Sequence, residues 1–262
     1  MMVRAAAADA EEDTLFGKDK RGDELPDELQ RRETRLARIR EARRVVEEGA
    51  REKAKAQGKP EDEAQPEAKA QYNFTDPESR IMKSSNEGFV QAYNAQIVVE
   101  PELQLIVGQA VTQAGNDKEQ VAPMMQTVEA QSGQRPEAVI ADSGYCSEKN
   151  LETLESEPRA ERRIEAFMAT ERPKHGERRV CGRGPLPKGA TRVERMKRKL
   201  LTKAGAAIYA ARKGIVEPVF GQIKEARGFR RFSLRGFEKV KAEWALVCAT
   251  HNILKMYRAC YQ

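Results

Sequence analysis

Four apolar residues, Ala138–Ala141, are followed directly by Asp142 and the turn sequence Ser143-Gly144. A fully apolar run of this length, ended by turn residues, is typical of a strand buried inside a sheet. It predicts a central strand with a carboxylate at its carboxyl end, the edge at which active sites of open α/β sheets gather. A carboxylate there needs a cationic partner, and a divalent metal ion is the natural one. The alternative is that Asp142 only forms the turn or caps a helix, because Asp-Ser-Gly is favourable turn chemistry.

The segments around this strand predict an α/β fold. Apolar and β-branched residues in 88–100 and 103–113, separated by a Pro-Glu turn, predict an antiparallel strand pair. Helix signals occupy 117–133 and 147–157, and 162–170 predicts another strand. Antiparallel strands that precede a central strand, with helices between, indicate a mixed sheet flanked by helices.

The carboxyl-terminal third predicts a loop and then two helical segments. We expect a basic excursion over 172–203, followed by helical structure over 203–226 that is interrupted at Gly214 and Pro218. The final helix is amphipathic, and one face carries Phe237, Val240, Trp244, Val247 and Leu254. His251 continues this face, so we interpret it as a core histidine; His175 lies in the excursion and is interpreted as a solvated loop residue.

The amino-terminal part has a different composition. Residues 25–57 predict a charged helix, and the Gly-, Pro- and charge-rich residues 58–71 predict a linker. The apolar stripe of that helix, Leu29, Leu36, Ile39 and Val46, is thin, so a short coiled coil and a solvated charged helix both stay open. We therefore expect a partly disordered charged helical extension over 1–70 and a folded domain over 71–262.

Charge is distributed unevenly along the 262 residues. Residues 1–170 contain 24 Lys/Arg and 34 Asp/Glu, whereas residues 171–262 contain 23 Lys/Arg and 7 Asp/Glu. So basic a carboxyl-terminal third indicates a polyanionic partner, most simply nucleic acid. A basic face that only keeps the protein soluble is the alternative. The four cysteines lack metal-ligand spacing, and no signal peptide or membrane span is recognisable, so the sequence indicates a cytoplasmic protein without a membrane partner.

One acid, Glu217, opens this basic segment, and Lys224 follows seven residues later. In an α-helix this spacing is two turns, roughly 10 Å along one face. An acid that binds a metal and a lysine that contacts a phosphate would suit such a spacing. An ordinary surface pair is the alternative. Further candidates for DNA contact are Tyr209, Arg212, Lys213, Arg230, Arg231 and Arg235. Phe229, Phe232 and Phe237 are interleaved with the arginines, as in surfaces that grip nucleic acid strands.

Five blocks between Tyr72 and Lys255 resemble bacterial insertion-sequence DDE transposases with a ribonuclease-H-like catalytic domain. They are TDPESRIMKSSNEGFVQAYNAQ, VIADSGY, ATERPKHG, YAARKGIVEPVFGQIKEARGFRRFSLRG and KVKAEWALVCATHNILK. The resemblance implies that Asp142 is the second acid of the catalytic triad and Glu217 the third. The family signature Y-x2-R-x3-E-x6-K is met by Glu217 and Lys224, but four residues separate Arg212 from Glu217.

The resemblance also implies a chemistry and its partners. Three carboxylates would hold two Mg2+ or Mn2+ ions about 3.5–4 Å apart, which cleave and transfer DNA strands at transposon ends and into target DNA. Asp142 and Glu217 are the metal ligands that this sequence offers. The resemblance allows for self-association as well.

The first acid of the family, in a DGT-like strand, has no equivalent block in this sequence. We therefore expect a ribonuclease-H-like sheet that lacks its first strand, in a carboxyl-terminal piece of a transposase with little or no activity by itself. Asp76 before Pro77 is interpreted as a turn residue, not as a replacement. An inactive DNA-binding remnant, which competes or assembles with full-length enzyme, is the alternative function; a basic scaffold without a DNA role is the third.

Overall fold

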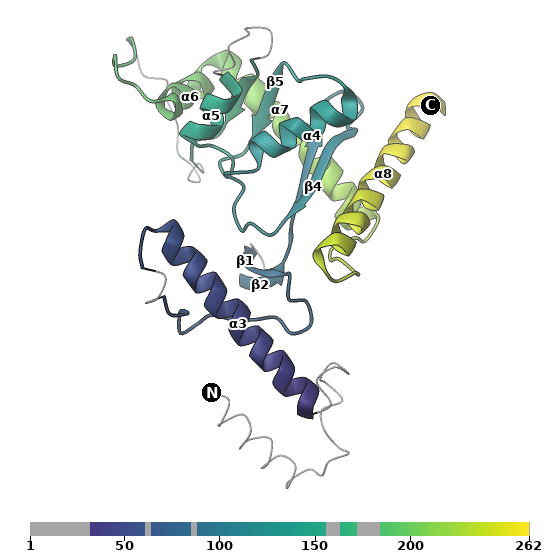
Figure 1. Cartoon of the computed structure of the whole chain (residues 1–262). Coiled ribbons are helices and arrows are strands. Elements are labelled where there is room, and N and C mark those ends of the chain that lie inside the picture. Colours follow the sequence, from purple (N-terminus) through teal and green to yellow (C-terminus); the bar gives the residue numbers. More distant parts are fainter. Residues whose placement is uncertain (1–31, 61–63, 85–87, 156–162, 172–183, 262) are drawn as a thin grey trace. The chain divides into compact units, whose positions relative to one another are not determined.

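The computed structural model describes residues 32–60, 64–84, 88–155, 163–171 and 184–261. The chain divides into two compact units, Met1–Glu78 and Ser79–Gln262. The first unit contains the helix α3, Arg32–Ala56 (Figure 1). Exposed ion pairs lie along its surface. Arg43 pairs with Glu47 and Arg44 with Glu48, four residues apart, and in each pair the nitrogen and oxygen are 2.7 Å apart. Each pair of this kind stabilises a helix by about 0.2–0.5 kcal/mol, which compensates for the thin apolar stripe.

The second unit is α/β, as predicted, and its described strands form three two-stranded sheets. β1 (Arg80–Ser84) pairs with β2 (Gly88–Ala92), and β3 (Asn94–Val99) pairs with β4 (Ile106–Thr112), both antiparallel. β5 (Ala138–Ala141) and β6 (Glu165–Met168) are parallel. The predicted antiparallel pair is confirmed as β3 and β4. The segment 88–100 is not one strand, however, because its first half turns away at Tyr93 to pair with β1.

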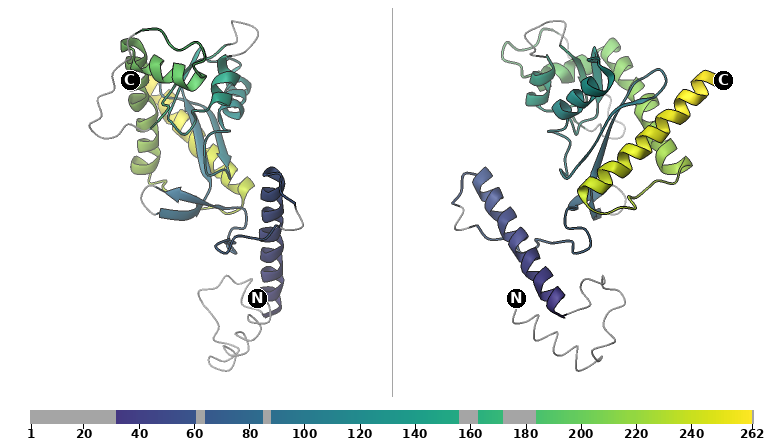
Figure 2. Two further views of the ribbon diagram at one scale, coloured as in Figure 1. Left: turned by 90° about the vertical axis from the view of Figure 1, so that its left-hand side faces the viewer. Right: turned by 45° about the vertical axis from the view of Figure 1, so that its right-hand side comes forward.

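Helices cover both faces of the β3–β4 sheet (Figures 1 and 2). On one face, α4 (Val121–Ser132) buries Val121, Met124, Met125 and Val128 in a core that also contains α5 (Glu148–Glu155) and β6. Gly108 of β4 allows this approach, since a Cβ there would lie 2.8 Å from Cγ2 of Val128. On the other face, α8 (Phe237–Tyr261) buries Val240, Trp244 and Val247.

α8 is also fixed to the strands by polar contacts. The indole Nε1 of Trp244 donates to the carbonyl of Gln96 at 3.1 Å. The side-chain amide of Asn252 exchanges two hydrogen bonds of 2.8 Å with the backbone of Ile106. His251 is buried and its Nε2 lies 3.1 Å from the carbonyl of Gln104, so it is a core histidine as predicted. The spacing places Leu254 on the same buried face, but this residue is 40% exposed.

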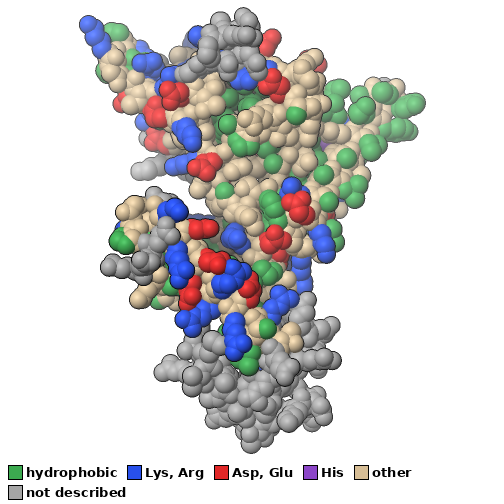
Figure 3. Space-filling view, viewed as in Figure 1, with side chains coloured by type: hydrophobic (Ala, Val, Ile, Leu, Met, Phe, Trp, Pro, Cys, Tyr) green, Lys and Arg blue, Asp and Glu red, His purple; other side chains and the backbone are tan. Residues whose placement is uncertain are grey.

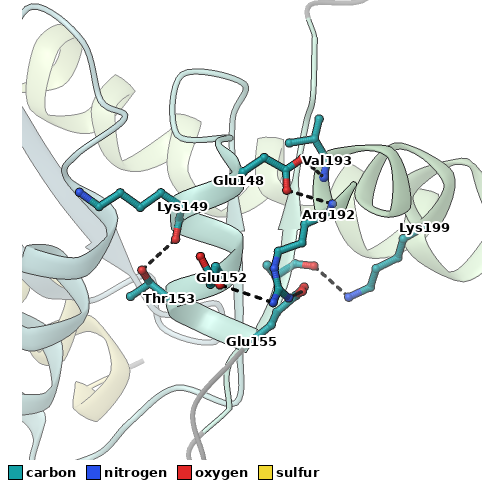
Figure 4. Close-up of polar contacts among 9 residues, drawn as sticks. Glu148, Lys149, Glu152, Thr153, Glu155, Arg192, Val193 and Lys199 are labelled. Atoms are coloured by element: carbon teal, nitrogen blue, oxygen red, sulfur yellow. Dashed lines mark hydrogen bonds and ion pairs between the residues drawn. The ribbon is translucent and has the colours of Figure 1, made fainter. Parts of the chain in front are cut away.

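The predicted loop excursion is wrong in its second half. Residues 172–183 lie outside the described residues, but α6 spans Arg192–Leu201. Its first turn is closed by a capping box between Thr191 and Glu194. The carboxylate of Glu148, at the start of α5, also accepts the N–H groups of Arg192 and Val193, each at 3.0 Å (Figure 4). These bonds satisfy donors that a helix start otherwise leaves unpaired, and they fasten α5 to α6.

The predicted interruption at Gly214 and Pro218 is also wrong. α7 runs without a break over Lys203–Gly221 and continues into the π-helical turn η3, Gln222–Ala226. Pro218 has no N–H to donate to the carbonyl of Gly214 four residues earlier. The side chain of Gln104 replaces that donor, because its Nε2 lies 2.8 Å from the Gly214 oxygen. A hydrogen bond from outside the helix therefore allows the proline in its interior.

β5 departs from its prediction as a central buried strand. Among the described residues it pairs on one side only, with β6, and its side chains are half-buried or exposed. β3 likewise pairs on one side, with β4. Yet α7 packs against β3, β5 and β6, and residues of both sheets contribute to the core beneath α4. The two sheets thus share their helical layers without sharing a hydrogen-bonded edge.

Candidate functional site

Asp142 lies at the carboxyl end of β5, where the sequence places it. Its side chain is exposed, and its Oδ1 accepts the N–H of Gly144 at 2.8 Å. The carbonyl of Asp142 accepts the N–H of Tyr145 at 3.3 Å, which closes the turn. Asp142 is therefore a turn-forming residue, as the alternative interpretation stated. This contact does not conflict with a role in binding, because a carboxylate has about four acceptor positions.

A second carboxylate, Asp117, lies beside Asp142. A Cβ built on Gly144 would be 3.0 Å from Oδ2 of Asp117 and 3.1 Å from Oδ1 of Asp142, so the two oxygens are separated by no more than those distances combined. A side chain at position 144 would press on both carboxylates, which would have to shift by a few tenths of an ångström. Asp117 was not singled out by sequence reasoning. The available signal was its place in a polar turn shortly after a predicted strand, the same context that drew attention to Asp142.

Amide side chains from β3 hold Asp117 in place. Asn94 Nδ2 and Gln96 Nε2 both donate to Oδ1 of Asp117 at 2.7 Å. Gln96 is buried, and its Oε1 accepts the hydroxyl of Tyr145. Burial raises the pKa of Tyr145, and the negative charges of Asp117 and Asp142 raise it further. The phenol thus remains a protonated donor, and the network ties the turn after β5 to the strand β3.

Glu217 lies on α7, where it contacts Arg212, and Arg212 in turn lies against the ring of Tyr209. Oε1 of Glu217 is 3.4 Å from Nη2 of Arg212, and Cζ of Arg212 is 5.9 Å from the centre of the Tyr209 ring. The extra residue between Arg212 and Glu217 therefore does not prevent their contact. Glu217 itself is exposed, whereas the Nε of Arg212 is buried and has no hydrogen-bond partner among the described residues.

The spacing argument for Lys224 has to be corrected. Lys224 lies in the π-helical turn η3, in which each turn takes more residues than in an α-helix, so the spacing of two α-helical turns from Glu217 does not apply to it. Its Nζ lies 5.0 Å from the centre of the Phe220 ring, and the side chain is exposed.

The interleaved aromatic residues are half-buried and pack against the core beneath α8. The ring centres of Phe229 and Phe232 lie 6.3 Å and 6.2 Å from that of Trp244. The rings of Phe232 and Phe237 both contact the ring of Tyr93. The cations between them point outward: Lys213, Lys224, Arg230, Arg231 and Arg235 are exposed. Arg230 pairs with Glu225. The segment therefore uses its rings for packing and leaves its positive charges at the surface.

The described residues do not assemble a complete metal centre. Asp117 and Asp142 are close together, and Glu217 lies on a helix that packs against β5. Within those residues, however, no group of three or more His, Cys, Asp or Glu side chains is arranged to hold a metal ion. The acids present do not fit a two-metal centre by themselves. None of the described helices is both long and apolar enough to cross a membrane.

Comparison with known proteins gives one finding. Neither the curated proteins nor the solved structures yield a match to the chain. A family model described as a transposase DDE domain matches residues 54–253, which include every described strand and all of the described helices from α4 to α7. The matched region also contains Asp117, Asp142 and Glu217. The chain belongs to the transposase DDE domain family.

Proposed function

We propose that this chain carries part of the DNA-cleaving centre of an insertion-sequence transposase, and that by itself it binds DNA but cuts it little or not at all. Asp142 and Glu217 would be two of the three acids, and Mg2+ or Mn2+ the ions. The claim that the chain cuts DNA little or not at all rests on one observation: among the described residues, no three acids are grouped to hold a metal ion.

The proposed fold is a ribonuclease-H-like sheet over residues 71–262 without its first strand, preceded by a charged helical extension over 1–70. Its support is that, within the described ranges, β3 and β5 each have one edge without a partner strand, and both strands pack against α7. A strand between them would complete the sheet, and an acid on that strand would lie near Asp142. The family's first acid is expected on such a strand.

DNA is the proposed partner of the basic surface. Lys213, Lys224, Arg230, Arg231 and Arg235 are exposed cations that would contact phosphates without reading sequence. Arg212 has a donor without a hydrogen-bond partner among the described residues, and Tyr209 lies against its guanidinium group. These residues would bind transposon ends and target DNA alike.

The test combines binding and cutting. The purified chain should bind duplex DNA with an affinity that falls steeply with salt, and it should leave a supercoiled plasmid intact in Mn2+. Mn2+ should still broaden the amide NMR signals of Gly144 and Tyr145, and Asp142→Asn should remove the broadening. Nicking that depends on both Asp142 and Glu217 would show that the centre is complete, and a failure to bind DNA would reject the proposal.

The second candidate, a non-catalytic DNA-binding protein, is favoured by the ion pair between Arg212 and Glu217. In that case the acid serves to position an arginine and not a metal. Glu217→Gln should then weaken DNA binding, because Arg212 loses its partner. If Glu217 is a metal ligand instead, the same change should leave metal-free DNA binding unchanged or stronger, since a negative charge is removed near the phosphates.

A further inference from the structure

Residues 227–236, here called the basic loop, connect η3 to α8 and contain four arginines. The loop has no helical or strand structure. Glycines in the left-handed region lie near both of its ends, with a φ of 68° at Gly228 and 87° at Gly236. Glycine adopts these angles without strain, so the chain can turn sharply at both points. Contacts from outside the loop must therefore fix its shape.

The carboxylate of Glu243, in the second turn of α8, supplies one of these contacts. The backbone nitrogen of Ser233 lies 3.0 Å and 3.1 Å from its two oxygens, and that of Leu234 lies 3.0 Å from one of them. Hydrogen bonds to an ionised acceptor are stronger than those between neutral groups. A single partly buried acid thus holds two consecutive N–H groups at the middle of the basic loop.

Neighbouring residues of α8 hold the first half of the loop. The rings of Phe229 and Phe232 pack against the ring of Trp244. Nη1 of Arg227 lies 3.0 Å from the carbonyl oxygen of Val247, so this arginine fastens the loop to the helix. In Figure 3, charged side chains lie at the amino-terminal end of α8, where the basic loop joins it, whereas hydrophobic ones occupy the other end.

The other three arginines of the basic loop, Arg230, Arg231 and Arg235, are exposed. All three lie within three residues of the N–H groups that Glu243 accepts. A mobile loop would have to be ordered when these side chains bind phosphates, and ordering costs affinity. We propose that Glu243 is a positioning residue, which fixes the basic loop so that its arginines meet DNA phosphates already ordered. This inference rests on the proposed DNA-binding function and names the residue that prepares the surface for it.

Charge and positioning predict opposite results for Glu243→Gln. The change removes a negative charge beside the arginines, so charge alone would strengthen the binding of duplex DNA. The new amide, however, places an NH2 group where a carboxylate oxygen accepts an N–H. We expect the loop to loosen and the affinity for a fluorescent duplex, measured by anisotropy at fixed salt, to fall about fivefold or more.

Glu238→Gln is the matched control on the same helix. It removes the same charge, but the Glu238 carboxylate is exposed and forms an ion pair with Lys241 of α8 itself, at 3.1 Å. This variant should bind DNA as tightly as the unmodified chain or more tightly. Glu243→Asp keeps the charge and shortens the side chain, so it should weaken binding although the net charge is unchanged. Hydrogen exchange of the Ser233 and Leu234 amides should accelerate in both Glu243 variants and not in the control.

A background in which Arg230, Arg231 and Arg235 are changed to alanine separates positioning from a general loss of stability. This background should bind DNA more weakly, and Glu243→Gln should weaken it no further, because the arginines that Glu243 positions are gone. Three results would overturn the inference and leave DNA binding by the chain intact: a background that binds as tightly as the unmodified chain, a further loss on adding Glu243→Gln, or a Glu243→Gln variant that binds as tightly as Glu238→Gln. If the unmodified chain does not bind DNA, the proposed function fails and this inference fails with it.

Discussion

Gln104 joins the two long helices of the carboxyl-terminal third. Its Nε2 donates to the carbonyl of Gly214 in α7, and its Oε1 accepts from Nζ of Lys255 in α8 at 2.7 Å. Its backbone has a φ of 58°, which is uncommon for a residue other than glycine. A single side chain in a left-handed turn thus compensates for Pro218 and connects α7 to α8.

This arrangement predicts a specific coupling between Gln104 and Pro218. Gln104→Ala should destabilise the protein by about 1–2 kcal/mol, because the carbonyl of Gly214 loses its donor. In a Pro218→Ala background the cost should be smaller, since an alanine at that position has an N–H that can make the bond within α7. Denaturant unfolding of the four proteins measures the coupling as a double-mutant cycle. Equal costs of Gln104→Ala in both backgrounds would contradict the explanation of how α7 tolerates its proline.

His251 should make stability depend on pH. Burial lowers the pKa of His251 below its ordinary value of 6.5, and the charges of Lys255 and Arg227 add to this effect against the hydrogen bond with Gln104. The folded state therefore holds the imidazole neutral, whereas the unfolded chain takes up a proton below pH 6.5. Stability is highest above that pH and falls as the pH decreases toward the lowered pKa. Unfolding free energies between pH 7.5 and 5 should fall less steeply in His251→Gln than in the unmodified chain.

At the scale of elements, periodicity and capping signals predicted more than residue composition did. The antiparallel pair, α4, α5, β6 and α8 all follow from apolar spacing and cap residues. α6 was missed, although Thr191 and Glu194 form the capping box that its sequence displays. The high charge of 192–203 concealed this signal, because Met196 is its only buried residue. A helix that is fixed mainly by its cap and by Glu148 has little apolar pattern to detect.

Long-range contacts explain the elements that local rules could not predict. No sequence rule connects Pro218 to Gln104, which is distant along the chain, so an interruption was the reasonable expectation for α7. Phe229 and Phe232 alternate with arginines in the sequence, but only the position of Trp244 shows that the rings face inward. Asp117 and Asp142 lie in separate turns, and their proximity depends on the network through Gln96. Local patterns thus identified the acid on β5 but not its neighbour.

The capping contact between α5 and α6 carries an element-scale prediction. Hydrogen bonds from the N–H groups of Val193 and Arg192 hold the pKa of Glu148 below its usual range. Glu148→Gln should therefore destabilise the protein at pH 7, and the difference should shrink as the pH falls toward that lowered pKa. Glu152→Gln is the control, because the Glu152 carboxylate has only a 3.9 Å exposed ion pair with Arg192. Hydrogen exchange of the α6 amides should rise in Glu148→Gln alone.

At the scale of the whole molecule, the two units differ in how they use charge. In α3 of the first unit, Arg43 and Arg44 form ion pairs with glutamates of the same helix. In the second unit, the segment from η3 to α8 directs its aromatic rings into the core and leaves Lys224, Arg230, Arg231 and Arg235 exposed. These four exposed cations are a local concentration of positive charge in the second unit that can act on a polyanion.

This concentration predicts where the salt dependence of DNA binding resides. Changing Lys224, Arg230, Arg231 and Arg235 together to alanine should lower the slope of log affinity against log salt by up to about 0.9 for each phosphate that the variant no longer neutralises. Changing Arg35, Arg38, Arg40 and Arg51 of α3 to alanine removes the same net charge from the other unit, so it is the matched control. If binding follows net charge alone, both variants will show the same decrease in slope. If the exposed cations around η3 contact the DNA, only the variant that lacks Lys224, Arg230, Arg231 and Arg235 will show a decrease in slope. A larger decrease in the α3 variant would show that the DNA binds the other unit.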